Sequence, residues 1–189
     1  LQLLTTRPQQ KGEEIANAIS HGVAALAAIA GTVCLIVHAV RMGTTLNITC
    51  VSLYGGSMIL LYLFSCLYHA LTIPKGKSVL RVFDHCSIFL LILGSYIPIA
   101  LLVVGGPVGI SLVVVNSICA LLGIILTAIN LTRWQKLSLA LYIIMGWSAI
   151  CVIRPVVLAI SLKGLALIVG GGLLYTAGIV FYKMKKRRY

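Results

Sequence analysis

Six side chains in the first half of the chain have the chemistry of a metal site, because they are imidazoles, carboxylates, a hydroxyl and an amide. They are Glu14, Asn17, His21, Ser65, His69 and Asp84. The first three are spaced at i, i+3 and i+7, and the next two at i and i+4, so each set shares one face of a helix. Neutral imidazoles hold zinc, the metal acidifies a bound water, and a carboxylate orients that water or takes its proton. The residue types therefore indicate a zinc site that activates water.

Most of these residues also have a structural interpretation. The helix dipole favours an acid such as Glu14 in a first turn. Asn17 and Ser65 are suited to hydrogen bonds between helices. A single histidine, whether His21 or His69, is more often a satisfied polar residue than a ligand. His69 with one weaker candidate also falls short of the three protein ligands of a catalytic zinc, so both interpretations stay open.

Asp84 is harder to explain structurally. Only Glu13, Glu14 and Asp84 are acidic among the 189 residues, and a carboxylate held near membrane-spanning segments is costly and a default candidate for function. The structural alternative is a salt bridge with Arg81, three residues earlier on the same helix. His85 is turned about 100° away from Asp84 on a helix, so we expect it to be a satellite of the site.

Long apolar segments must position these residues. The chain is 60% hydrophobic and 10% charged, which excludes an ordinary soluble globular domain, and about 18 apolar residues suffice to cross a bilayer as a helix. We predict six membrane-spanning helices, at 16–40, 48–71, 82–104, 108–129, 137–153 and 165–181. Arg154-Pro155 is expected to end or kink the fifth helix.

The predicted fold class is therefore all-α, a polytopic membrane helical bundle in one integral membrane domain over residues 1–189. A polar N-terminal segment at 1–12 and a basic tail at 183–189 flank the apolar part. No stretch between the helices is long or polar enough to form a separate soluble domain.

The basic residues predict the orientation. With a cytoplasmic N-terminus, twelve of the fifteen Lys and Arg residues fall on the cytoplasmic side, as the positive-inside rule requires. The net charge of +12 is then explained by the basic residues that orient the helices in the membrane. A nucleic-acid partner is disfavoured because no soluble basic domain exists. The expected partners are membrane lipids. The first helix begins, the second ends and the third begins on this side, which brings all six polar side chains to similar depth in the cytoplasmic leaflet.

Several sequence blocks resemble the bacterial haemolysin III family. They are EEIANAISHG (13–22), SCLYH (65–69), DHCSIF (84–89), GSYIP (94–98), YIIMGW (142–147) and GGGLLYTAG (170–178). Each block is weak alone, but together they follow the family's order over nearly the whole chain. The family is related to progestin and adipoQ receptors, including the adiponectin receptors, and more distantly to alkaline ceramidases.

This resemblance implies a seven-helix bundle with an intramembrane zinc near the cytoplasmic face. In it His69 would ligate the zinc, Asp84 would contact the zinc-bound water and Ser65 would lie beside them. The residues implied as supports are Glu14, Asn17 and His21. The other two ligands belong to a His-x-x-x-His motif that opens the seventh helix of the family.

The printed sequence ends at Tyr189, where that seventh helix would begin. We expect the sequence to be part of a longer protein; the alternative is a natural variant without the helix. The six helices alone would leave the zinc site incomplete, so we expect the printed chain to bind zinc weakly and to be inactive as an enzyme.

The function that the resemblance implies is that of a multi-pass protein of the bacterial inner (plasma) membrane. By analogy with the ceramidases, its zinc-bound hydroxide would attack an amide of a membrane lipid. The first alternative is a cytolysin or pore-forming haemolysin, which the sequence supports little because it has no secretion signal and no amphipathic soluble form. The second is an adiponectin-receptor-like signalling protein, for which no local residue offers a test.

Overall fold

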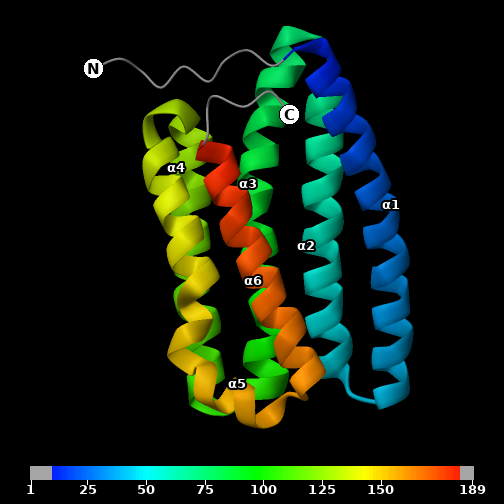
Figure 1. Ribbon diagram of the computed structural model, residues 1–189, viewed down its shortest axis with the longest axis vertical. Helices are drawn as coiled ribbons and strands as arrows, with labels where there is room; N and C mark the ends of the chain where they lie inside the picture. The colour runs from blue at the N-terminus through cyan, green and yellow to red at the C-terminus, as the bar shows by residue number, and fades with distance from the viewer. Residues whose placement is uncertain (1–9, 184–189) are drawn as a thin grey trace.

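The computed structural model describes residues 10–183, and within that range every regular element is a helix (Figure 1). The elements are α1 (Lys11–Met42), α2 (Thr45–Ala70), α3 (Pro74–Pro98), η1 (Ile99–Val104), α4 (Gly106–Trp147), η2 (Ser148–Val152), α5 (Ile153–Ala159) and α6 (Leu162–Lys183). The expected all-α class is confirmed. Parts of the predicted terminal segments, residues 1–9 and 184–189, lie outside the described residues.

The helices are long and apolar enough to cross a membrane. Five such helical stretches occur among the described residues, at Lys11–Arg41, Thr45–Ala70, Pro74–Val104, Gly106–Ala159 and Leu162–Val180. Many of their large apolar side chains point outward, and Leu26, Leu158 and Leu162 are 70%, 78% and 81% exposed. Such a surface is stable only against lipid, so the chain is a multi-pass membrane protein.

The third helix begins earlier than the sequence predicted. It starts at Pro74 rather than at residue 82, because proline suits the first turn of a helix, where its missing N–H is not needed. The basic residues that follow can extend their long side chains toward the membrane surface, so they do not interrupt the helix. Asp84 consequently lies in about the third turn, and the prediction that it opens the helix is wrong.

The fourth long stretch folds back on itself at Asn130, whose φ of −160° and ψ of 90° are not helical. A hydroxyl–hydroxyl hydrogen bond of 3.1 Å joins Thr127 to Ser138, residues that would be about 16 Å apart along a straight helix. Asn116 and Ser148 are also hydrogen bonded, at 3.0 Å. The two arms of α4 therefore lie side by side, as Figure 1 shows.

The opposite end of the bundle contains two irregular connections. After Pro98, α3 continues as the π-helix η1 and stops at Gly105, whose positive φ of 64° suits glycine. The second arm of α4 ends at Trp147 in the 3-10 turn η2. The chain thus breaks before the expected Arg154-Pro155, and Pro155 lies in the first turn of α5, where it disturbs no helical hydrogen bond.

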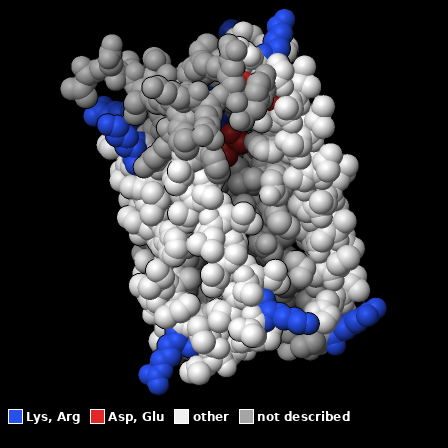
Figure 2. Space-filling view, in the orientation of Figure 1, with Lys and Arg blue, Asp and Glu red and all other residues white. Residues whose placement is uncertain are grey.

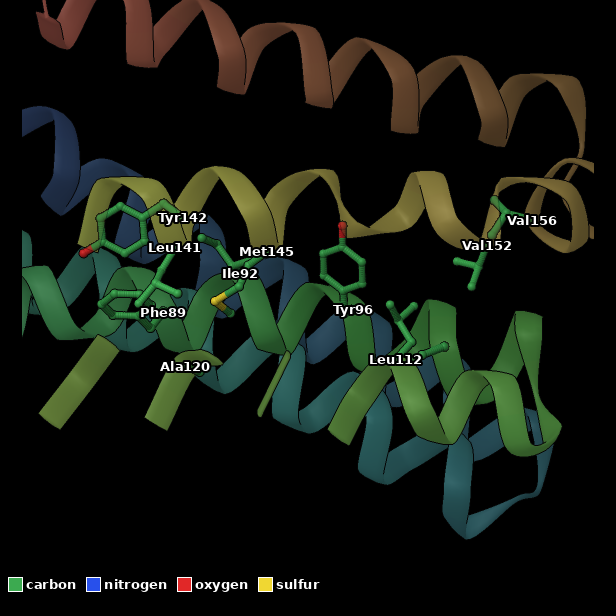
Figure 3. Packing of buried hydrophobic residues seen from close by; sticks show 11 residues of the cluster. Phe89, Ile92, Tyr96, Leu112, Ala120, Leu141, Tyr142, Met145, Val152 and Val156 are labelled. Atoms are coloured by element: carbon green, nitrogen blue, oxygen red, sulfur yellow. The ribbon is translucent and has the colours of Figure 1, made fainter. Parts of the chain in front are cut away.

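The buried apolar core lies mainly between α3 and α4 (Figure 3). Phe89 and Met145 are almost fully buried in it, and the rings of Phe89 and Tyr142 lie 4.3 Å apart between centroids. Tyr96 adds polar contacts, since its hydroxyl donates to Gly146 O and accepts from the Ala149 N–H, both at 2.9 Å. This core fixes α3 against the second arm of α4.

Small residues bring α1, α2 and α3 close together. A Cβ added to Gly55 of α2 would overlap Thr32 of α1, and one added to Gly94 of α3 would overlap Ser57 of α2. Contacts between small residues are the usual way in which helices associate in lipid. The close packing holds the beginnings of α1 and α3 beside the end of α2, which is where the polar residues lie.

Candidate functional site

A cavity of about 800 Å³ opens at the end of the bundle where α1 and α3 begin. Residues of α1, α2, α3, both arms of α4 and α6 form its wall. Its polar lining residues on the first three helices are Glu14, Tyr68, His69, Lys77, Arg81, Asp84 and His85. Figure 2 shows acidic atoms inside a hollow on the face turned to the viewer. The volume lies within the range of roughly 300–1,000 Å³ that is usual for small-molecule sites.

A hydrogen-bonded chain of three residues links three helices on one side of this cavity. Glu14 Oε2 of α1 lies 2.8 Å from His69 Nδ1 of α2, and Glu14 Oε1 lies 2.9 Å from Lys77 Nζ of α3. The carboxylate can only accept here, so His69 carries a hydrogen on Nδ1 and, in its neutral form, a lone pair on Nε2. This carboxylate–histidine pairing is the arrangement that orients imidazole ligands in metal sites.

The second histidine of the predicted site binds elsewhere. His21 Nδ1 lies 2.6 Å from Ser65 Oγ, and the His21 ring meets the His69 ring edge-on with centroids 5.9 Å apart. Neither His21 nor Ser65 lines the cavity. Asn17 is half-buried on α1 and is likewise outside the lining. The structure thus brings Glu14, His69 and Asp84 to the cavity, and the other three predicted residues are not among its lining residues.

Asp84 lines the cavity together with Arg81 and His85, but it is not paired with Arg81. Among the described residues no ion pair joins Asp84 to Arg81, and the basic group closest to Asp84 Oδ2 is His85 Nδ1, at 3.6 Å. That distance is too long for a hydrogen bond, and His85 Nδ1 donates instead to Arg81 O at 2.8 Å. His85 lines the cavity beside Asp84, and its role as a satellite of the site stays a prediction.

The described residues hold an incomplete set of metal ligands. Within residues 10–183 no group of three His, Cys, Asp or Glu side chains is close enough to bind one ion. His69 and Asp84 offer one imidazole nitrogen and one carboxylate to the same cavity. This fits a zinc site in residue chemistry but not in ligand number, because a catalytic zinc takes three protein ligands.

Several lining residues were missed from the sequence. Lys77, Arg81, Asp84, His85 and Ile88 follow one another at i, i+4, i+7, i+8 and i+11, so they share one face of α3. The sequence contains that spacing, but the predicted start of the helix at residue 82 left Lys77 and Arg81 outside the helix. The cavity residues of α4 and α6 carried no such signal, because they depend on the turn at Asn130.

The wall of the cavity that α4 and α6 form combines aliphatic side chains with hydroxyl and amide groups. Its residues from α4 and α6 include Thr127, Leu131, Gln135, Ser138, Leu139, Tyr142, Tyr175 and Ile179. Tyr175 OH donates to Tyr142 O at 3.0 Å and so attaches α6 to α4. This side of the cavity carries no charged side chain among the described residues, so it can accommodate an apolar group.

Charge distribution places the cavity at one end of a membrane slab. On the face shown in Figure 2, Lys and Arg gather at the two ends and the surface between them is uncharged. Helices of this length and apolarity, ending in basic residues, are typical of integral membrane proteins. The molecule is thus a multi-pass helical membrane protein with a cavity near one end that ionisable side chains line.

Comparison with known proteins identifies the family. The model of the family described as "Haemolysin-III related" matches residues 9–188. "Hemolysin-3" of Bacillus cereus is 39% identical over 183 residues, which cover 97% of this chain and 84% of the relative. "Hemolysin-3 homolog" of Bacillus subtilis is 40% identical over 174 residues, covering 92% and 82%. No solved structure matches. The chain belongs to the haemolysin III related family.

Proposed function

We propose that this chain is a membrane hydrolase-like protein that uses zinc to attack an amide of a membrane lipid. The observation that carries the proposal is the Glu14–His69 hydrogen bond of 2.8 Å, in which His69 uses Nδ1, at the edge of a cavity that His69 and Asp84 both line. A carboxylate that holds one ring nitrogen while the other is free is the arrangement of a metal-ligating histidine. The helices that form the cavity lie against lipid, which favours a lipid substrate.

The cavity residues would divide the work as follows. His69 would bind the metal through Nε2, and Asp84 would accept a proton from the attacking water. Ser65, which is hydrogen bonded to His21, would position the histidine cluster from behind. Zinc, when bound, supplies a Lewis acid and an acidified water. Its remaining ligands would come from outside residues 10–183.

Zinc content tests this assignment directly. We expect the full-length protein, with the ligands that this chain lacks, to retain zinc, measured per chain by elemental mass spectrometry, and its His69→Ala variant to lose most of that zinc. His38→Ala is the matched control, because His38 is an exposed histidine of α1 that does not line the cavity. Equal zinc in the wild type and His69→Ala would show that the site is wrong.

The proposal also includes six membrane crossings with a cytoplasmic N-terminus in the bacterial plasma membrane. The antiparallel arms of α4, joined by the Thr127–Ser138 and Asn116–Ser148 hydrogen bonds, support one crossing for each arm. The excess of Lys and Arg on the side of the cavity supports the orientation.

Cysteine accessibility tests the orientation. Ser78 of α3 and Lys163 of α6 are exposed at opposite ends of the bundle. On a background without native cysteines, Lys163→Cys should react with an impermeant thiol reagent in intact cells, and Ser78→Cys should react only after permeabilisation. Labelling of Ser78→Cys from outside would place the cavity in the outer leaflet and contradict the proposal.

The relatives' names favour a second candidate, a lytic protein, since both matched proteins are described as hemolysin-3 proteins. Dye release from liposomes distinguishes the two candidates. Dose-dependent leakage that is the same for the wild type and Asp84→Asn would support lysis, because a pore does not need the cavity carboxylate. Lipid hydrolysis that Asp84→Asn abolishes, without leakage, would support the hydrolase.

A further inference from the structure

A smaller hollow of about 320 Å³ adjoins the large cavity at the end of the bundle. Both spaces are lined by the same four residues, which are Tyr68, Lys77, Arg81 and Leu131. The hollow also has two exposed hydroxyl residues, Ser78 and Thr132, in its lining. A ligand at the boundary would therefore have the smaller hollow, with its hydroxyl groups, on one side and the larger cavity on the other.

The two cations at this boundary differ in what they bind. Lys77 Nζ lies 2.9 Å from Glu14 Oε1, donates to Leu71 O at 3.3 Å and lies 5.0 Å from the centre of the Tyr68 ring. The Arg81 guanidinium, by contrast, has no hydrogen-bond or ion-pair partner among the described residues, although its side chain is half-buried. Among the described residues no buried side-chain nitrogen lacks a hydrogen-bond partner, so the Arg81 guanidinium is open to the cavity and not sealed in protein. Arg81 is therefore the lining cation that is available to bind an anionic ligand.

The larger cavity suits an acyl chain. Four large aliphatic side chains of the cavity lining, Ile88, Leu131, Leu139 and Ile179, are called the apolar wall here, and burial of apolar ligand surface against such side chains is favourable. A guanidinium binds phosphate and carboxylate groups through paired hydrogen bonds. The boundary thus joins an anion-binding group to an apolar pocket.

We propose that the cavity binds a single-chain amphiphile with an acidic headgroup, phosphate or carboxylate, which Arg81 holds while the acyl chain occupies the apolar wall. The inference rests on the proposed function to the extent that it names the substrate class of that same cavity. Asp84 follows Arg81 by three residues, about 4.5 Å along the helix axis. A linkage next to the headgroup would therefore lie near the carboxylate.

Binding to the whole protein in phosphatidylcholine nanodiscs tests the inference. The probes are a radiolabelled lysophosphatidic acid and a monoacylglycerol with the same chain, which differ only in the phosphate. We expect the wild type to bind the acidic probe at least tenfold more tightly, a difference of about 1.4 kcal/mol. Arg81→Gln should abolish this preference, and Arg81→Lys should restore part of it because charge returns without the paired geometry.

Arg133→Gln is the matched control. Arg133 is exposed on α4 near the same end of the bundle, lies over the Trp134 ring at 5.4 Å and does not line either space, so its loss should leave the preference unchanged. Equal affinity for the two probes, or a preference that survives Arg81→Gln, would overturn the inference. Displacement of the acidic probe by millimolar inorganic phosphate would also overturn it, because the site would then take a free anion.

The outcome is independent of zinc chemistry. His69→Ala removes the proposed metal ligand but leaves Arg81 and the apolar wall in place. If the zinc site is wrong and the headgroup site is right, zinc content will not change in His69→Ala while the acidic preference remains. If only the headgroup site is wrong, zinc will depend on His69 and the two probes will bind equally.

Discussion

The ion pair between Glu14 and Lys77 should couple α1 to α3 energetically, and a double-mutant cycle can measure that coupling. The four proteins are the wild type, Glu14→Gln, Lys77→Met and the double variant. Glu14 contacts both Lys77, at 2.9 Å, and His69, at 2.8 Å, so its removal disturbs two partners while removal of Lys77 disturbs one. The two single variants should therefore differ in cost.

The exposure of the side chains sets the magnitude. Lys77 and Glu14 are 27% and 20% exposed, and His69 is 8% exposed. The pair thus lies between surface pairs, worth about 0–1 kcal/mol, and buried pairs, whose disruption costs about 3–5 kcal/mol. We expect Lys77→Met to reduce the free energy of unfolding by about 1–2 kcal/mol and Glu14→Gln by about 2–3 kcal/mol, because a buried histidine also loses its charged acceptor. The double variant should cost about 1 kcal/mol less than the sum.

The assay is equilibrium unfolding in mixed micelles with increasing SDS, followed by far-UV circular dichroism. Lys75→Met is the matched control, because Lys75 is exposed in the first turn of α3 and lines neither space. Its substitution should change the free energy by less than about 0.5 kcal/mol. Additive single costs, within about 0.3 kcal/mol, would refute the reasoning, since they would mean that the carboxylate and the ammonium do not interact.

Two further predictions concern the packing of α4. A Cβ at Gly123 would overlap the Phe89 ring, so Gly123→Ala should reduce the free energy of unfolding by about 1–3 kcal/mol in the same assay. The control is Gly171→Ala, whose Cβ meets open space and which should be neutral or stabilising by up to about 1 kcal/mol. Equal effects of the two substitutions would contradict the packing of α3 against α4. The Thr127 and Ser138 hydroxyls lie 3.1 Å apart, so cysteines at both positions should form a disulfide under mild oxidation, seen as a mobility shift in a gel. A straight helix through residue 130 would keep them apart.

The helices could be predicted from the sequence because lipid leaves a backbone few alternatives. Long uncharged segments must satisfy their own hydrogen bonds, which makes an α-helix the default. The ends were less predictable, since hydropathy marks where apolar residues stop and not where helical hydrogen bonds stop. Residues 74–81 show the difference, because they include three basic residues but continue α3 outward with a proline at its first position.

The candidate site was predictable only in part for a related reason. Spacing on single helices grouped Glu14 with His21 and Ser65 with His69, and helix parity placed both groups at one depth. Which side chains then meet depends on how the helices rotate against each other, which the sequence pattern does not determine. The rotation pairs Glu14 with His69 and His21 with Ser65, so the contacts run between the groups and not within them.

The two walls of the cavity have different compositions, so we expect one wall to bind the metal and the other to select the ligand. All of the charged and imidazole groups that line it belong to α1, α2 and α3, which close-packed small residues hold together. The wall from α4 and α6 supplies hydroxyls, an amide and apolar surface, and the described part of α6 is largely unburied. Because no hydrogen bond of the Lys77–Glu14–His69 chain involves that wall, substitutions such as Leu139→Ala should change which chain length binds while zinc retention stays the same. A parallel loss of zinc would show that the two walls do not act separately.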